Sequence, residues 1–219
     1  KSGGEMFWDS GNTGSATLNK NVTTYDATIK HSGNYSAKLQ SQYVALFGIG
    51  AFAAGNVFVG KFLKIDGTDG ILRFGRPFTS RPSKLVLYYR YVAGTVDYST
   101  LSELPKNSKD MGSIYIALGD WPHQTFEGET DIPVLVKTKP ADRQLFDSNS
   151  SNVIGYGECI LKESTEGEGL IKLEIPINYR SNRKPTDIIL VGSASRYGDY
   201  FTGSTGSTLW LDDLELIYE

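Results

Sequence analysis

The sequence predicts an all-β fold, a two-sheet antiparallel β-sandwich of jelly-roll type, and three observations lead to it. About ten short segments alternate apolar with polar residues or are continuously apolar. Turns rich in Gly, Pro and Asn separate these segments, and no helical periodicity is sustained. Aromatic residues make up 12% of the chain, which suits pleated sheets with rings packed on their faces. No repeat or low-complexity linker divides the chain, so we expect a single domain over residues 1–219.

The segments expected to form strands follow one another with polar loops between them. Residues 1–34 are expected to form an irregular segment with an edge strand. Strands are then expected at 35–40, 57–65, 71–74, 85–91, 113–118, 132–137 and 170–177, with a Gly-broken apolar run at 44–54. Polar loops are expected at 97–112 and 140–152. Residues 154–163 are the one segment that is also compatible with a helix.

The C-terminal run predicts two further strands. Residues 188–191 are apolar on both faces, as expected of a strand in the middle of a sandwich. The last strand spans 209–218, and its alternation changes phase at Asp212 and Asp213, which predicts a β-bulge. A bulge can turn carboxylates toward an N-terminal segment, so we predict a structural calcium site at these two residues. In the alternative, they face water or accept backbone hydrogen bonds.

Composition excludes several classes of function. The net charge is -3, with 22 basic and 25 acidic residues, which gives no electrostatic case for nucleic acid or an anionic membrane. A single cysteine, Cys159, excludes an internal disulfide and a multi-cysteine zinc site. No apolar run is long enough to span a membrane as a helix. A neutral partner is therefore expected.

Aromatic rings stand beside short polar residues in three stretches, 8–12, 120–123 and 196–201. Sugars stack their C–H faces on Trp and Tyr and bond their hydroxyls to Asn, Asp and Arg, so this combination indicates a glycan site. The predicted ligand-binding residues are Trp8, Asn12, Asp120, Trp121, Arg196, Tyr197, Asp199 and Tyr200. The alternative for each ring is core packing, which we favour for Trp210 because leucines flank it.

Loop carboxylates supply candidates for the acid pair of a glycoside hydrolase. They are Asp120, Glu127, Glu129, Asp131 and Asp199. No spacing in the sequence brings two of them to one scissile bond. The chain also has no nucleophile elbow, phosphate-binding loop or dinucleotide fingerprint. We therefore expect a protein without enzymatic activity.

Two strings carry a resemblance to a known family. They are Phe74-Gly-Arg-Pro-Phe-Thr-Ser-Arg-Pro and Ser193-Ala-Ser-Arg-Tyr-Gly-Asp-Tyr-Phe-Thr-Gly. In this order, with the ending Trp210-Leu-Asp-Asp-Leu-Glu-Leu, the chain resembles the putative carbohydrate metabolism domain family. That family occurs in surface and secreted proteins of gut-dwelling Gram-negative bacteria. The resemblance implies a jelly-roll sandwich in an exported protein or lipoprotein, often behind an N-terminal immunoglobulin-like module.

The ending also resembles the last strand of many carbohydrate-binding modules. In those modules an acid near this position ligates a structural calcium ion, and a second ligand comes from near the start of the chain. The resemblance implies that Glu5 or Asp9 could serve as that second ligand here.

These observations lead to one hypothesis with two alternatives. We expect a non-catalytic glycan-binding module, the C-terminal domain of a longer exported protein, held by a lipid anchor at the outer-membrane surface or in the periplasm. Its partner is then a poly- or oligosaccharide. The first alternative is a structural or adhesion module that binds protein. The second is a glycoside hydrolase, which two facing carboxylates in one cleft, one with a raised pKa, would favour.

Overall fold

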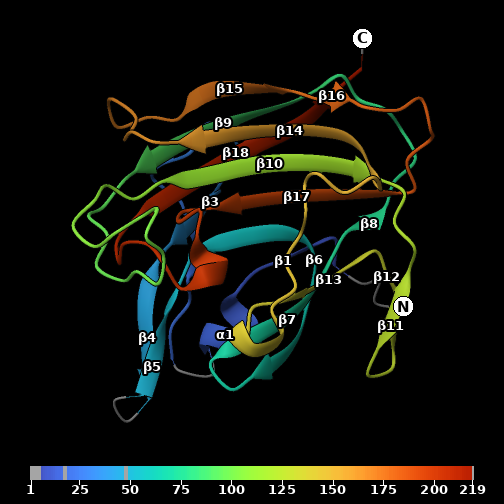
Figure 1. Cartoon of the computed structure of the whole chain (residues 1–219). Helices are drawn as coiled ribbons and strands as arrows, with labels where there is room; N and C mark the ends of the chain where they lie inside the picture. The colour runs from blue at the N-terminus through green and yellow to red at the C-terminus, as the bar shows by residue number, and fades with distance from the viewer. Residues whose placement is uncertain (1–5, 17–18, 47–48, 219) are drawn as a thin grey trace.

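The computed structural model describes residues 6–16, 19–46 and 49–218. Its larger sheet has the strand order β13-β7-β6-β17-β10-β14-β16, with β1 beside β6 and β8 beside β17. These strands are β13 (Val134–Lys137), β7 (Asp69–Phe74), β6 (Asn56–Asp66), β17 (Asp187–Ser193), β10 (Gly112–Gly119), β14 (Val153–Leu161), β16 (Asn178–Tyr179), β1 (Trp8–Asp9) and β8 (Arg76–Pro77). Figure 1 shows this sheet curving from β14 to β7.

The smaller sheet has the order β15-β9-β18-β3-β2. Its strands are β15 (Ile171–Pro176), β9 (Lys84–Val92), β18 (Thr208–Ile217), β3 (Ser36–Gln40) and β2 (Thr23–Asp26). Two hairpins stand apart, β4 (Gln42–Leu46) with β5 (Ile49–Ala53), and β11 (Gln124–Phe126) with β12 (Glu129–Ile132). The helical pieces are α1 (Asn12–Ser15) and the 3₁₀ turns η2 (Pro140–Asp142) and η3 (Gly198–Tyr200). No helix in the described part of the chain is long and apolar enough to cross a membrane.

The predicted all-β sandwich is confirmed. The pairings within both sheets are antiparallel in the described residues. Consecutive strands pass from one sheet to the other, as from β9 to β10, β14 to β15 and β17 to β18, in the manner of a jelly roll. Leu39, Leu87, Ile116 and Leu209 are among the fully buried residues that fill the space between the sheets.

Strand β17 lies in the middle of the larger sheet and is buried on both faces, as predicted. Ile188 and Leu190 point into the core between the sheets. Ile189 and Val191 point to the other side, into a second apolar cluster. Because successive side chains of a strand point to opposite faces, this short run joins two separate cores.

The second apolar cluster covers the outer face of the larger sheet and is closed by residues 139–152. The expected polar loop is present there, but it also carries Phe146, whose ring stacks on Tyr115 with the centroids 5.4 Å apart. Trp121 meets Phe146 edge-on at 6.3 Å and is only 7% exposed. Trp121 therefore packs as a core residue on this face, which was the alternative to an exposed ring.

Most of residues 154–163, the one segment also compatible with a helix, lies in β14 (Val153–Leu161). Tyr156 and Glu158 pair with Ala117 and Tyr115 of β10. Gly155 and Gly157 let β15 and β16 approach closely, because an added Cβ at Gly157 would lie 2.4 Å from the carbonyl oxygen of Pro176. Glycine has low helix propensity, so two glycines in this run agree with the strand.

The predicted bulge in the last strand is confirmed. The register between β18 and β9 shifts between Asp212 and Glu215, and Asp213 has a left-handed φ of 47°. Trp210 is buried as expected, but on the outer face of the smaller sheet. The guanidinium of Arg90 lies 5.2 Å from its ring centroid, and its Nε1 donates to Asp26 at 3.0 Å.

Replacing Trp121 with alanine tests its packing role. We expect Trp121→Ala to lower the free energy of unfolding by about 3–5 kcal/mol, because it removes a buried ring and leaves a cavity. Tyr25→Ala is the matched control, since Tyr25 is 72% exposed on β2 and its ring contacts Tyr35 edge-on, and it should change stability by less than about 1.5 kcal/mol. Urea unfolding measures both. A Trp121→Ala protein as stable as the control would contradict this packing.

Candidate functional site

A cavity of about 240 Å³ lies on the outer face of the larger sheet, beside the second apolar cluster. Four chain segments build its walls: α1, the β4–β5 hairpin, the turn between β6 and β7, and residues 196–201 after β17. Figure 1 shows α1, β4–β5 and η3 below β10 and β17 of the larger sheet in that view. The walls come from both ends of the sequence and from its middle.

Two rows of side chains from neighbouring strands form the floor. Cross-strand pairing sets these rows, because paired residues point to the same face. The polar row is Asn56, Ser193 and Ser113, and the apolar and aromatic row is Phe58, Val191 and Tyr115. Phe62 and Leu72 extend the apolar part. The cavity thus has a polar and an apolar side.

Gly198 allows residues 196–201 to close against the rest of the molecule. A Cβ at this position would lie 2.3 Å from the Cβ of Ala54, which is a collision. Only glycine therefore lets η3 pack on the chain between β5 and β6. This contact sets the position of the next residue, Asp199, in the cavity wall.

Asp199 has an uncommon environment for a carboxylate. Its side chain is open to the cavity, and it has no hydrogen-bond or ion-pair partner among the described residues. Asp199 is an exposed residue, yet desolvation by the surrounding protein raises its pKa to about 6, although the charge of Arg143 acts in the opposite direction. Asp199 can therefore accept hydrogen bonds from a ligand, and it changes charge near neutral pH.

Asp69 is a second carboxylate in the same cavity, contributed by β7. It is half-buried and accepts a hydrogen bond from Thr138 Oγ1 at 3.3 Å. Burial raises the pKa of Asp69 and outweighs this hydrogen bond, which acts to lower it. Two carboxylates with raised pKa values thus line one cavity.

Two arginines lie beside these acids. Arg196 lines the cavity and forms an ion pair with Glu158 of β14. Arg143 comes from the loop after η2, and its guanidinium carbon lies 4.6 Å from the ring centroid of Tyr200. Its Nε donates to the carbonyl oxygen of Thr138 at 3.1 Å. Arg143 therefore joins the loop over the sheet to the segment that carries Asp199.

A buried carboxylate anchors this segment from the other side. Asp110 Oδ2 accepts from Ser195 Oγ at 2.6 Å and from the backbone N–H of Ser204 at 2.8 Å, and the Met111 N–H donates to Oδ1 at 2.8 Å. Burial raises the pKa of Asp110, and these hydrogen bonds act to lower it. Asp110 thus holds both ends of the loop that carries Asp199.

The structure brings together four of the eight residues predicted to bind a ligand. Arg196 and Asp199 line the cavity. Tyr197 and Tyr200 lie beside them, with their ring centroids 6.4 Å apart, and Tyr200 meets Arg143 at 4.6 Å. The predicted loop 196–201 is therefore part of the site.

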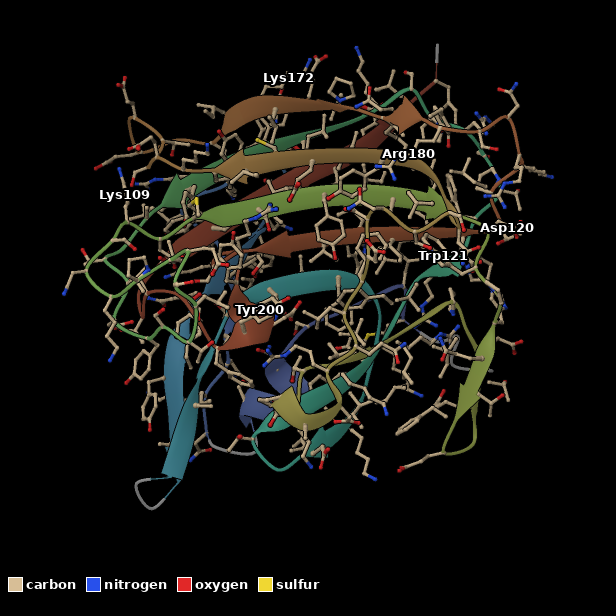
Figure 2. All side chains as sticks on the ribbon, in the orientation of Figure 1. Lys109, Asp120, Trp121, Lys172, Arg180 and Tyr200 are labelled. Atoms are coloured by element: carbon tan, nitrogen blue, oxygen red, sulfur yellow. The ribbon has the colours of Figure 1, made fainter. Side chains whose placement is uncertain are left out.

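The other four predicted residues lie elsewhere. Trp8 packs against the core between the sheets. Asn12 bridges the backbone of Thr23, donating to its carbonyl at 2.6 Å and accepting from its N–H at 2.9 Å. Asp120, the residue before Trp121, forms an ion pair with Arg183, with 3.3 Å between Oδ2 and Nη1. Since β10 and β17 are antiparallel, Trp121 after β10 and Tyr200 after β17 lie at opposite ends of the sheet, and Figure 2 shows them well apart.

Sequence reasoning missed Asp69 and the sheet residues of the floor. Asp69 stands in the run Asp66-Gly-Thr-Asp-Gly, which is typical of a hairpin turn and carries no sign of a ligand. Ser113 and Ser193 stand among the apolar residues of their strands, where a small polar residue carries no sign of a ligand. Both point to the outer face of the larger sheet, where the cavity lies.

The carboxylates of Asp212 and Asp213 hold the turn at residues 31–32. Asp212 Oδ2 accepts from the N–H groups of His31 at 2.8 Å and Ser32 at 3.2 Å. Asp213 pairs with His31 Nδ1 at 2.7 Å and accepts from Ser32 Oγ at 2.9 Å. The His31 ring stacks on Tyr88 with centroids 3.3 Å apart. The alternative to the predicted calcium site was that Asp212 and Asp213 accept backbone hydrogen bonds, and Asp212 does so here.

The described residues fit a calcium ion poorly at this bulge. Calcium prefers six to eight oxygen ligands, whereas the oxygens of Asp212 and Asp213 already accept from protein donors. No group of three or more His, Cys, Asp or Glu that could hold a metal occurs in the described part of the chain. Asp9 instead accepts from the Phe62 N–H at 2.8 Å, and Glu5 lies outside the described residues.

Fold and site together define an all-β sandwich protein with a carboxylate-lined cavity on the outer face of one sheet. The model of the putative carbohydrate metabolism domain family matches residues 1–217, so the chain belongs to that family. This confirms the resemblance seen in the sequence. No match was found among curated proteins.

Two solved structures have the same fold. One, from Bacteroides thetaiotaomicron, is described as a putative glycoside hydrolase and shares 23% identity with a TM-score of 0.69. The other, from Bacteroides vulgatus, has the same description, 24% identity and a TM-score of 0.70. The alignments cover 100% of this chain, and 65% and 89% of the two relatives. This chain therefore spans less than two thirds of the length of the first.

Replacing Asp213 with asparagine tests the role of the bulge. We expect Asp213→Asn to cost less than about 1 kcal/mol near pH 7, because its pair with His31 is exposed. The hydrogen bonds lower the pKa of Asp213 in the folded protein. Its stabilisation is therefore present above the ordinary carboxyl pKa and is lost as pH falls through the lowered value.

Thermal melts of wild type and Asp213→Asn, run from neutral to acid pH with and without EDTA, measure this effect. We expect the two midpoints to converge in acid and EDTA to change neither. A wild-type midpoint that falls on addition of EDTA would instead support calcium, since loss of a ligand lowers stability.

Proposed function

We propose that this protein is a glycan-binding module and that the cavity beside Asp199 holds one sugar ring. The observation that carries the proposal is a carboxylate without a protein partner among the described residues, placed beside a floor with one polar and one apolar row. Membership of a carbohydrate-related family supports the choice of ligand.

Each side of the cavity suits one part of a sugar. The partly exposed Phe62 ring can pack against the C–H face. The Asp199 carboxylate can accept hydrogen bonds from ring hydroxyls, and such bonds to a charged group are stronger than neutral ones. The Ser15 hydroxyl also lines the cavity, is buried, and has no partner among the described residues. A ligand hydroxyl would satisfy it.

The volume limits the size of the ligand. About 240 Å³ is below the roughly 300–1,000 Å³ of pockets that hold drug-sized molecules. One sugar ring is therefore the unit that we expect inside, with any further chain outside the cavity. This differs from a platform on loop tips, where several rings of a polysaccharide lie on exposed Trp and Tyr side chains.

The cellular context remains part of the proposal. We propose an exported protein at a bacterial surface, lipid-anchored in its full length and preceded by an immunoglobulin-like module. The support is the resemblance to surface and secreted members of the family. Proteolytic accessibility in intact cells would test it.

Binding measurements test the glycan proposal. We expect a glycan array to identify a ligand, and calorimetry on it to show about tenfold weaker binding for Asp199→Asn, because a charge-assisted hydrogen bond is lost. Tyr25→Ala, on the far edge of the smaller sheet, should bind like wild type. Absence of binding to every glycan tested, including plant and mucin polysaccharides, would refute the proposal.

Glycoside hydrolysis is a second candidate, favoured by the two carboxylates of raised pKa that line one cavity. A protonated Asp199 would donate its proton to the glycosidic oxygen, and an ionised Asp69 would take a proton from the attacking water. The pKa of Asp199, about 6, is suited to an acid that works near neutral pH. Both structural neighbours are described as putative glycoside hydrolases.

A reducing-sugar assay separates the two candidates. As a binding module, the wild-type protein should release no reducing ends from the glycan that it binds. Hydrolysis would instead give release that Asp199→Asn and Asp69→Asn both abolish. Because the acid must be protonated, that activity would fall as pH rises through about 6. Release with this profile would replace the binding proposal with the hydrolase.

A further inference from the structure

We infer that the cavity selects an uncharged sugar and rejects an acidic one, such as a uronic acid or a sulfated sugar, and that Asp199 is the main determinant. This inference rests on the proposed glycan binding and names the chemical class of the ligand. It follows from the charges of the side chains at the cavity and from which of these charges are neutralised by an ion pair.

Three charged side chains line the cavity: Asp69, Asp199 and Arg196. Arg196 is already compensated, because it forms an ion pair with Glu158 below it on β14. Neither Asp69 nor Asp199 has an ion-pair partner among the described residues. Hydrogen bonding does not compensate them equally, since Thr138 donates to Asp69, whereas Asp199 accepts no hydrogen bond from any described residue. The lining is therefore negative.

The charged groups just outside the lining change this balance little. Lys139 contacts both carboxylate oxygens of Asp66 at 3.1 Å, so these two charges cancel. Arg143 is the remaining cation, and it acts on both Asp69 and Asp199. Its guanidinium is held over the Tyr200 ring and on the Thr138 carbonyl. The Arg143 guanidinium therefore acts on two carboxylates. An acidic ligand would have to compete with Asp69 and Asp199 for this one cation.

Geometry makes this repulsion strong. A sugar ring inside about 240 Å³ brings any substituent within a few ångströms of the walls. Like charges at that distance repel appreciably even at the effective dielectric constant of about 20 that suits partly exposed sites. At this separation, which is shorter than the Debye length, salt screens the repulsion only in part. A neutral hydroxyl, in contrast, can donate to Asp199. We expect at least a tenfold preference for the neutral sugar.

Matched sugar pairs test the inference. Calorimetry or competition on an array compares oligosaccharides that end in galactose or galacturonate, in glucose or glucuronate, and in N-acetylglucosamine or its 6-sulfate. The neutral member of the bound pair should bind at least tenfold more tightly. Asp199→Asn should bind the neutral sugar more weakly. It should also reduce the gap, the difference in affinity between the neutral and the acidic member of the pair. Glu163→Gln removes one negative charge at a site that is 77% exposed and outside the cavity, and it should leave the gap unchanged.

Each outcome is decisive. Equal or tighter binding of the acidic member overturns the inference and leaves glycan binding intact, and loss of that binding in Arg143→Gln would identify the cation responsible. A gap that Asp199→Asn leaves unchanged, in a variant whose circular dichroism and melting match wild type, also overturns it. No binding of any sugar refutes the proposed function, and the inference with it.

Discussion

The burial of β17 on both faces is the constraint on which the rest of the structure depends. Alternate residues of this strand enter the core between the sheets and the cluster on the outer face. Both faces of the larger sheet must therefore be shielded from water near its centre. A cover is required over the outer face, and the loop with Phe146 supplies it together with Trp121. The cavity is the part of this face that the cover leaves open.

Polar anchors then decide where the open part lies. Asp110 fixes the loop after β17 through Ser195 and Ser204, and Arg143 ties the same loop to the covering segment. Burying a carboxylate is costly unless its hydrogen bonds are satisfied, and those of Asp110 are. The loop that carries Asp199 is thus held by side chains that do not themselves line the cavity.

Much of the scaffold could be predicted from sequence, because it depends on local alternation. The two-faced strand at 188–191 and the phase slip at Asp213 each follow from the order of apolar residues. Only part of the candidate site could be predicted from the sequence. Asp199, which lines the cavity, could be singled out because it stands among aromatic residues in a loop. Asp69 was missed because its contact with this cavity depends on the curvature of the larger sheet, which no local pattern encodes. The burial of Trp121 could not be predicted, since a Trp-Pro turn does not reveal what covers it.

The division between floor and walls has a consequence for how this domain can vary. The floor consists of strand residues whose other neighbours belong to the cores, whereas the walls are a short helix, the β4–β5 hairpin, the turn between β6 and β7, and one loop. Connecting segments tolerate insertion and exchange far better than central strands. Related chains can therefore diverge in the molecule that they recognise while keeping one sandwich. A library confined to residues 66, 68–69, 196–197 and 199–201, with Gly67 and Gly198 kept, would explore that diversity without placing the cores at risk.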